Sequence, residues 1–171
     1  SSLALEVDGR AEVAAVYDPS RKELFTAERG GGAHLNGRPI KVAAAEQLVD
    51  AMLVTGFPYD VHSRVEEIVG LFAAFVGRAR AVRRLGSAAI DLCYVAAGRM
   101  DGFWESDLKP WDIAGGALIV AEAGGTVTDL AGGAFSSRSR QVLASNGGLH
   151  DAMLAVIRDA RRPGLSSGRI E

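Results

Sequence analysis

The stretch KPWDIAGGALIVAEAGG, residues 109–125, combines one acid, Asp112, with a long apolar run and a closing pair of glycines. Gly124 and Gly125 are a typical helix stop, so the stretch predicts a helix from about Asp112 to Ala123. At the start of this helix, Asp112 is open to two interpretations. It can cap the helix by accepting hydrogen bonds from free amides, or it can hold Mg²⁺ while the neighbouring amides face an anion.

Further small and acidic residues surround this helix start. Gly115 and Gly116 lie in the first turns, where each costs about 1 kcal/mol relative to alanine. They therefore indicate close backbone approach by a ligand or by another helix. Upstream, Glu105 and Asp107 join Asp112 between a predicted strand end and a helix start, a place where α/β proteins often build sites. We interpret Asp107 as an ordinary solvated acid.

The segment RLGSAAID, residues 84–91, marks the start of a second helix. Its small residues Gly86, Ser87 and Ala88 have a backbone that can contact a ligand, and an ordinary capped helix explains them equally well. The helix that follows carries Cys93 among apolar residues. This cysteine is therefore predicted to be buried rather than catalytic.

The first half of the chain predicts strands followed by one more helix. Asp8-Gly9 and Asn36-Gly37 suit two-residue hairpin turns, which makes the first third of the chain an antiparallel meander. Ser63 and Glu66 form a capping-box pattern that opens the helix. Its apolar residues recur at the spacing of a helix packed on a sheet: Val65, Ile68, Val69, Phe72, Phe75 and Val76.

The remaining elements complete the predicted fold class. Strands are expected at residues 52–57, 79–85, 103–105, 126–130 and 141–145, and a last amphipathic helix at 149–160. Strands mixed with helices, without an internal repeat or a linker, indicate one layered α/β (α+β) domain over residues 1–160. The polar segment 161–171 is predicted to be a flexible tail.

The composition restricts the class of protein further. A chain of 171 residues with 48% hydrophobic and 23% charged residues is ordinary for one soluble globular domain. The net charge of -2 provides no basic field for nucleic acid, and no apolar segment reaches the roughly 18 residues of a membrane span. A single cysteine cannot form an internal disulfide, which agrees with a cytoplasmic location. We therefore expect no nucleic-acid or membrane partner.

Two other patterns are excluded as sites. Gly30–Gly32 lacks the GK[ST] of a nucleotide-binding loop, so we predict a turn or bulge in the meander. His34, His62 and His150 show no zinc-binding spacing and are interpreted as surface or core residues.

At these positions the sequence resembles the inositol monophosphatase family. WDIAGGALIVAEAGG, residues 111–125, is similar to the family's C-terminal signature W-D-x-A-A-G followed by an apolar run and E-A-G-G, with Gly115 in place of the common alanine. Three further segments resemble the family: GGGAHLNGRPIKV, LGSAAIDLCYVAAGRMDGFWE and QVLASN. The resemblance implies a layered α/β sandwich related to fructose bisphosphatase, with residues 1–160 as the C-terminal portion of one such domain.

The resemblance also implies an activity, a cofactor and a site. The family consists of Mg²⁺-dependent phosphomonoesterases that use metal-activated water, so the expected substrate is inositol monophosphate or a related sugar or polyol phosphate. Asp112 would be the catalytic metal ligand and contact the substrate, and Glu105 would bind a substrate hydroxyl. Gly86, Ser87 and Ala88 would line the substrate pocket. A homodimer is a further expectation from the family.

The chain departs from the family's pattern at its other metal ligands. These lie in a G-E-E-like stretch and in D-P-x-D-G-T, and neither motif occurs in the sequence. We therefore expect the N-terminal part of the domain to be missing and the chain to be inactive alone. Two alternatives follow: a non-catalytic phosphatase-like module, or a related phosphatase acting on histidinol phosphate, fructose bisphosphate or an adenosine phosphate.

Overall fold

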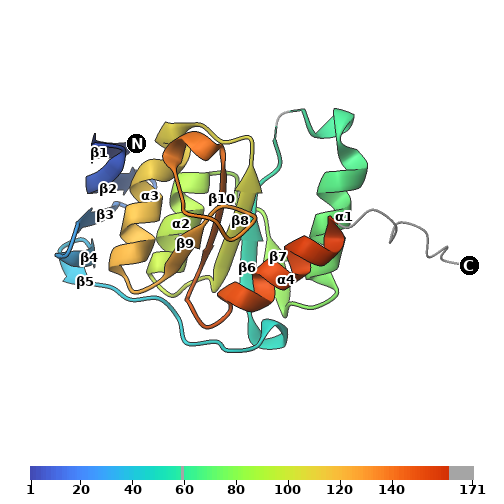
Figure 1. Ribbon diagram of the computed structural model, residues 1–171. Coiled ribbons are helices and arrows are strands. Elements are labelled where there is room, and N and C mark those ends of the chain that lie inside the picture. The colour runs from blue at the N-terminus through green and yellow to red at the C-terminus, as the bar shows by residue number, and fades with distance from the viewer. Residues whose placement is uncertain (59, 162–171) are drawn as a thin grey trace, which may run out of the picture.

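The computed structural model describes residues 1–58 and 60–161 as two β-sheets and four α-helices in alternating layers (Figure 1). The first sheet is an antiparallel meander, in the order β1-β2-β3-β4-β5. Its strands are β1 (Ser2–Val7), β2 (Arg10–Asp18), β3 (Glu23–Glu28), β4 (Gly32–Leu35) and β5 (Arg38–Pro39). The predicted meander is confirmed.

The second sheet is mixed, in the order β7-β6-β8-β10-β9. Its strands are β6 (Met52–Thr55), β7 (Ala81–Arg83), β8 (Gly102–Ser106), β9 (Thr126–Thr128) and β10 (Gln141–Ser145). β6 runs parallel to both β7 and β8, whereas β10 runs antiparallel to β8 and β9. All five predicted strands form, each close to its expected position.

The helices separate the sheets and cover the second sheet. α2 (Ala88–Ala96) and α3 (Pro110–Glu122) lie between the two sheets, and α1 (Val65–Val76) and α4 (His150–Ala160) lie on the far side of the second sheet (Figure 1). One apolar core fills the space around α2 and α3, and a second core lies under α1 and α4. Cys93 is fully buried in the first core, as predicted.

Both predicted hairpin turns have the backbone that their sequences favour. Asp8 and Gly9 have φ angles of 50° and 77°, and Asn36 and Gly37 have φ angles of 49° and 75°. Positive φ at both central positions is what a two-residue turn of this type requires. The tight turns therefore join β1 to β2 and β4 to β5 as antiparallel hairpins.

The helix α1 differs from its prediction in two respects. Ser63 is part of a short 3-10 helix, and its hydroxyl donates to the carbonyl of Asp60, so the predicted capping box with Glu66 is wrong. Arg64 takes the N-cap position instead and pairs with Glu67. Of the predicted apolar stripe only Phe75 is fully buried, because α1 lies at the margin of the sheet and leaves three valines about half exposed: Val65, Val69 and Val76.

The helix α3 begins two residues before the predicted position. Lys109 is its N-cap and Pro110 its first residue, a position where proline is favoured because its missing N–H is not needed. Asp112 is therefore the third helical residue rather than the N-cap. The predicted stop is confirmed, since Gly124 follows the helix with a φ of 86°.

The two glycines inside α3 meet neighbouring elements of the fold. A Cβ on Gly115 would lie 2.9 Å from the carbonyl oxygen of Leu3 in β1. A Cβ on Gly116 would lie 2.6 Å from the Cβ of Leu92 in α2. Approach by another helix is confirmed for Gly116, whereas Gly115 meets the strand β1, which was not predicted.

The remaining predictions concern the glycine turn of the meander, the histidines, membrane spans and the tail. Gly30 and Gly32 form the turn between β3 and β4, and both amides donate to the carboxylate of Glu122 at 3.0 Å. His150 is a core residue whose ring nitrogens lie 2.9 and 3.0 Å from the hydroxyls of Thr128 and Ser145. No helix among residues 1–58 and 60–161 is long and apolar enough to cross a membrane. The predicted tail, residues 161–171, lies outside the described residues except for Arg161.

Candidate functional site

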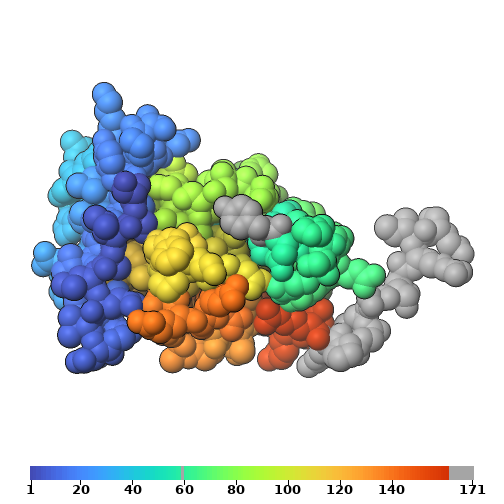
Figure 2. Space-filling model, turned by 90° about the horizontal axis from the view of Figure 1, so that it is seen from above, coloured from blue at the N-terminus to red at the C-terminus, as the bar shows by residue number. Residues whose placement is uncertain are grey.

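One large cleft of about 1000 Å³ opens where several chain segments end or begin. β6 and β8 are parallel, so their carboxyl ends reach the same edge of the sheet, and the starts of α2 and α3 follow there. The start of β1 and the end of β2 form the opposite wall. Seen from above in Figure 2, the blue strands, the yellow start of α3 and the green segment before α2 meet on this face.

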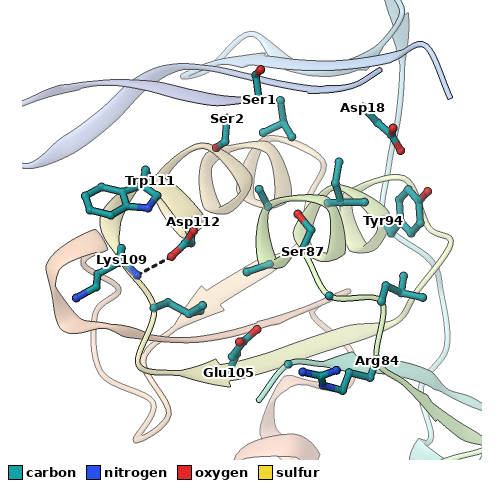
Figure 3. Close-up of a pocket in the computed structure, with 18 of the residues that line it drawn as sticks. Ser1, Ser2, Asp18, Arg84, Ser87, Tyr94, Glu105, Lys109, Trp111 and Asp112 are labelled. Atoms are coloured by element: carbon teal, nitrogen blue, oxygen red, sulfur yellow. Dashed lines mark hydrogen bonds between the residues drawn. The ribbon is translucent and has the colours of Figure 1, made fainter. Parts of the chain in front are cut away.

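Asp112 lies on the cleft wall with one carboxylate oxygen engaged and one open (Figure 3). Oδ2 accepts a hydrogen bond of 2.8 Å from the amide of Lys109. No group among the described residues hydrogen-bonds to Oδ1. The N-terminal end of α3 favours a negative charge at this position. One oxygen of Asp112 therefore caps the helix start, and the other remains available to a ligand.

Glu105 lies at the end of β8, half-buried on the cleft floor. Burial raises the pKa of its carboxyl to about 7, the negative charges of Asp91 and Asp112 add to this rise, and Arg84 opposes it. Near neutral pH the side chain is therefore present in both its protonated and its ionised form. It can accept a hydrogen bond from a ligand hydroxyl in one form and donate one in the other.

Gly56, which packs against the carboxylate of Glu105, was not predicted from the sequence. A Cβ added to Gly56 would coincide with the carboxylate of Glu105, so any larger residue would displace that side chain. The available signal was a glycine directly after the apolar strand MLVT. Such a glycine often marks close approach of another group to the backbone.

The three predicted pocket residues before and in α2 all line the cleft. Gly86 has a φ of 97° and turns the chain into the helix. Ser87 is the N-cap, but its side chain makes no capping hydrogen bond, and Ala88 begins the helix. Their contact with a substrate stays a prediction.

Asp107 differs from the solvated acid that the sequence suggested. Its carboxylate pairs with Arg64 from the start of α1 and, at 3.3 Å, with Arg140 from the turn before β10. The residue adopts a left-handed backbone with a φ of 63°, which directs the chain from β8 towards α3. Through these ion pairs Asp107 connects the end of β8 to the start of α1 and to the turn before β10, beside the cleft. The interpretation failed because both partners are distant in sequence.

An acid that was not predicted to have a role, Asp91, is fully buried in the first turns of α2. Neither carboxylate oxygen has a hydrogen-bond partner among the described residues. Burial raises the pKa of this carboxyl to about 7. Its position in an apolar helix pattern gave no signal of a role, yet its charge influences Glu105 in the cleft.

The cleft offers part of a site for a divalent cation. Within residues 1–58 and 60–161, no group of three or more His, Cys, Asp or Glu side chains is arranged to hold a metal ion. Mg²⁺ is often held by one or two protein carboxylates, with water and substrate phosphate filling the other positions. The open Oδ1 of Asp112 fits one such position, so the donor set is suitable in kind but incomplete.

Two sheets enclosing a helix pair, with a carboxylate-lined cleft at the strand ends, define a layered α/β sandwich. Residues 2–162 match the inositol monophosphatase family. The chain belongs to this family, as its sequence motifs predicted.

Curated relatives cover most of this chain at substantial identity. The chain is 46% identical over 158 residues to "Nus factor SuhB" of Escherichia coli K12 and 43% identical over 157 residues to "Inositol-1-monophosphatase" of Mesorhizobium japonicum. Each match covers 92% of this chain but 59% of the relative. The chain thus spans about three-fifths of the length of these relatives.

Solved structures show the same fold. An inositol monophosphatase from Anabaena superposes with a TM-score of 0.90 at 39% identity, covering 92% of this chain and 63% of that one. SuhB from Mycobacterium tuberculosis superposes with a TM-score of 0.83 at 37% identity, covering 94% and 63%. The predicted sandwich is therefore confirmed by structure as well as by family.

Proposed function

We propose that this chain belongs to a Mg²⁺-dependent phosphomonoesterase that acts on inositol monophosphate or a related sugar or polyol phosphate. The observation that carries the proposal is the open carboxylate oxygen of Asp112, which faces a cleft shared with Glu105. The 43% identity to a protein named inositol-1-monophosphatase supports the same substrate class.

The residues of the cleft take separate roles in this proposal. Asp112 holds Mg²⁺ and keeps its orientation through the hydrogen bond from Lys109. When bound, Mg²⁺ neutralises phosphate charge and makes a water molecule more nucleophilic. Glu105 hydrogen-bonds a hydroxyl of the polyol, and the backbone of Gly86, Ser87 and Ala88 forms the adjoining wall.

The proposal is tested by calorimetric titration of the 171-residue chain with inositol 1-phosphate in the presence and absence of Mg²⁺. We expect metal-dependent binding that Asp112→Asn weakens by at least about tenfold, since one charged ligand of the cation is lost. Asp151→Asn is the matched control, because Asp151 is also an acid in the first turn of a helix and does not line the cleft. Equal affinity of the Asp112→Asn variant and the unaltered chain would eliminate the assigned role.

The exact substrate is a separate question within this proposal. Histidinol phosphate, fructose bisphosphate and an adenosine phosphate are the alternatives. A polyol is favoured because Glu105 presents a carboxyl to ligand hydroxyls. Ranking these esters by kcat/KM, wherever turnover is measurable, decides between them because specificity is a difference in transition-state binding.

A second candidate function is a non-catalytic binding role. It is favoured by the 46% identity to proteins named Nus factor SuhB and by the incomplete set of metal-binding acids. A binding role of this kind does not depend on the cleft, so binding to a macromolecular partner that survives Asp112→Asn would support it. A cytoplasmic location, a homodimer and the lack of a nucleic-acid partner also stay proposals.

A further inference from the structure

The cleft contains a guanidinium group that the proposed chemistry leaves unused. Arg84 lines the cleft just before α2, and its side chain extends along the floor towards Glu105 (Figure 3). Its Cζ lies 5.0 Å from the centre of the Phe57 ring, a cation–π distance. The Phe57 ring in turn packs edge-on against Phe72 of α1 at 5.7 Å. Arg84 is therefore held against a supported aromatic surface.

Among residues 1–58 and 60–161, no carboxylate lies at ion-pair distance from the charge of Arg84. The described arginines that form ion pairs are Arg21, Arg29, Arg64, Arg99 and Arg140, and Arg84 is not among them. The other arginine on the cleft wall, Arg21, is neutralised by Asp18 at 3.1 Å. A guanidinium carries five N–H donors in a planar fork that matches phosphate and carboxylate groups. Arg84 is thus an exposed, available anion-binding group on the lining of the cleft.

The order of the charged side chains along the floor indicates how a ligand would lie in the cleft. In Figure 3 Glu105 lies between Asp112 and Arg84. The charges of both residues influence the carboxyl of Glu105, which agrees with this order. A ligand whose reacting phosphate lies at Asp112 and whose hydroxyl lies at Glu105 would extend its far end to Arg84. At about 1000 Å³ the cleft is at the upper end of ligand pockets, so it has room for such a molecule.

We propose that Arg84 binds a second anionic group of the substrate, so that the preferred substrates are phosphate esters that carry a further phosphate or carboxylate. This inference rests on the proposed phosphatase function. It adds a specificity residue, Arg84, that neither the sequence motifs nor the metal chemistry requires.

The inference is tested with pairs of ligands that differ in the second anion. Calorimetry with Mg²⁺ compares inositol 1-phosphate with inositol 1,4-bisphosphate, and glucose 6-phosphate with 6-phosphogluconate. We expect the doubly anionic member to bind about tenfold more tightly, because it forms one additional charge-assisted hydrogen bond. A gain in the first pair alone assigns Arg84 to a phosphate, and a gain in both assigns it to anions generally.

Substitutions of neighbouring arginines connect this preference to Arg84. Arg84→Ala should abolish the preference, and Arg84→Lys should retain part of it because the charge stays while the fork is lost. Arg83→Ala is the matched control, since Arg83 is exposed next in the chain and does not line the cleft. A thermal melt verifies that each variant is folded.

The outcomes separate this inference from the function on which it rests. Equal binding of both members of each pair, or a preference that survives Arg84→Ala, overturns the role of Arg84 and leaves the phosphatase proposal intact. Failure of every phosphate ester to bind overturns the phosphatase proposal, and the role of Arg84 with it.

Discussion

Single residues determine how carboxyl groups are presented to the cleft. Gly56 leaves space for the side chain of Glu105, and the amide of Lys109 holds one oxygen of Asp112. Buried Asp91 lies behind this surface without a hydrogen-bond partner among residues 1–58 and 60–161. The presentation of these carboxyl groups therefore depends on the backbone of Gly56 and Lys109 beside them.

Replacement of Gly56 by alanine should displace Glu105. The new methyl group would occupy the place of the carboxylate, and overpacking of this kind costs about 1–3 kcal/mol. We expect a lower free energy of unfolding in urea and weaker binding of polyol phosphates. Gly70→Ala in α1 is the control, because a Cβ at Gly70 meets nothing within 4 Å. Unchanged ligand affinity in Gly56→Ala would show that Glu105 does not contact the polyol.

Asp91 should make the stability of the protein depend on pH. Its folded-state pKa of about 7 lies above the ordinary value of 3.8. Below pH 3.8 the carboxyl is protonated in both the folded and the unfolded states, so it adds no pH dependence to the free energy of unfolding there. Between about pH 4 and pH 7 the unfolded chain releases a proton that the folded chain keeps, so the free energy of unfolding falls as the pH rises.

Asp91→Asn removes this titration. We expect the free energy of unfolding in urea, measured from pH 4 to pH 8, to change less with pH in this variant. The total change should be smaller by about 1.4 kcal/mol for each unit of difference between the folded-state and unfolded-state pKa values. Glu105→Gln serves as the comparison, since it removes a different titrating group and leaves that of Asp91. Parallel profiles for Asp91→Asn and the unaltered chain would contradict the assignment.

At the scale of elements, the pair of helices between the sheets determines where the cleft lies. α2 and α3 approach so closely that Gly116 packs directly on Leu92, and Gly115 packs on the backbone of Leu3. This contact brings the starts of both helices to the same edge, beside the ends of β6 and β8. The apolar signature of α3 is thus a packing feature as well as a mark of the site.

Gly116→Ala should destabilise the protein although alanine is the better helix former. The added methyl group would lie 2.6 Å from the Cβ of Leu92, in a core that has no space to yield. We expect a loss of about 1–3 kcal/mol in the free energy of unfolding, against a gain of about 1 kcal/mol from helix propensity alone. Thermal unfolding monitored by circular dichroism shows whether the substitution raises or lowers the stability. A stabilised variant would mean that α2 and α3 can move apart.

For the whole molecule, the outer face of the first sheet is unusually apolar. Leu3 and Leu5 on the edge strand β1 are 69% and 58% exposed, and Val13, the cross-strand partner of Leu5, is 43% exposed. Contiguous apolar surface beside an unpaired sheet edge promotes association. This face lies on the side of the sheet away from α3.

Leu5→Lys should therefore reduce self-association of the chain. A lysine on an edge strand opposes pairing by charge and leaves the strand itself intact. We expect sedimentation velocity to show a shift from larger species towards monomer. Val49→Lys is the control, because Val49 is 62% exposed in the short 3-10 helix Leu48–Asp50, away from this face. Similar effects of both substitutions would indicate a general effect of charge instead.

Local sequence patterns were enough to predict most helices and strands and their order along the chain. Local backbone preference predicts tight turns at Asp8-Gly9 and Asn36-Gly37. The residues around Asp112 likewise predict a helix start with an acid in its first turn. Such signals act over a few neighbouring residues, so they can be predicted from a single stretch of chain. The family followed from the same local motifs.

Contacts between residues far apart in the sequence could be identified from the folded structure alone. The contact of Glu105 with Gly56, the unpartnered burial of Asp91 and the pairing of Asp107 with two arginines all join residues far apart in the sequence. The physical reason is that burial, close packing and charge interaction depend on the three-dimensional neighbourhood, which no local pattern specifies. The availability of Arg84 became visible for the same reason, once every nearby carboxylate had been placed.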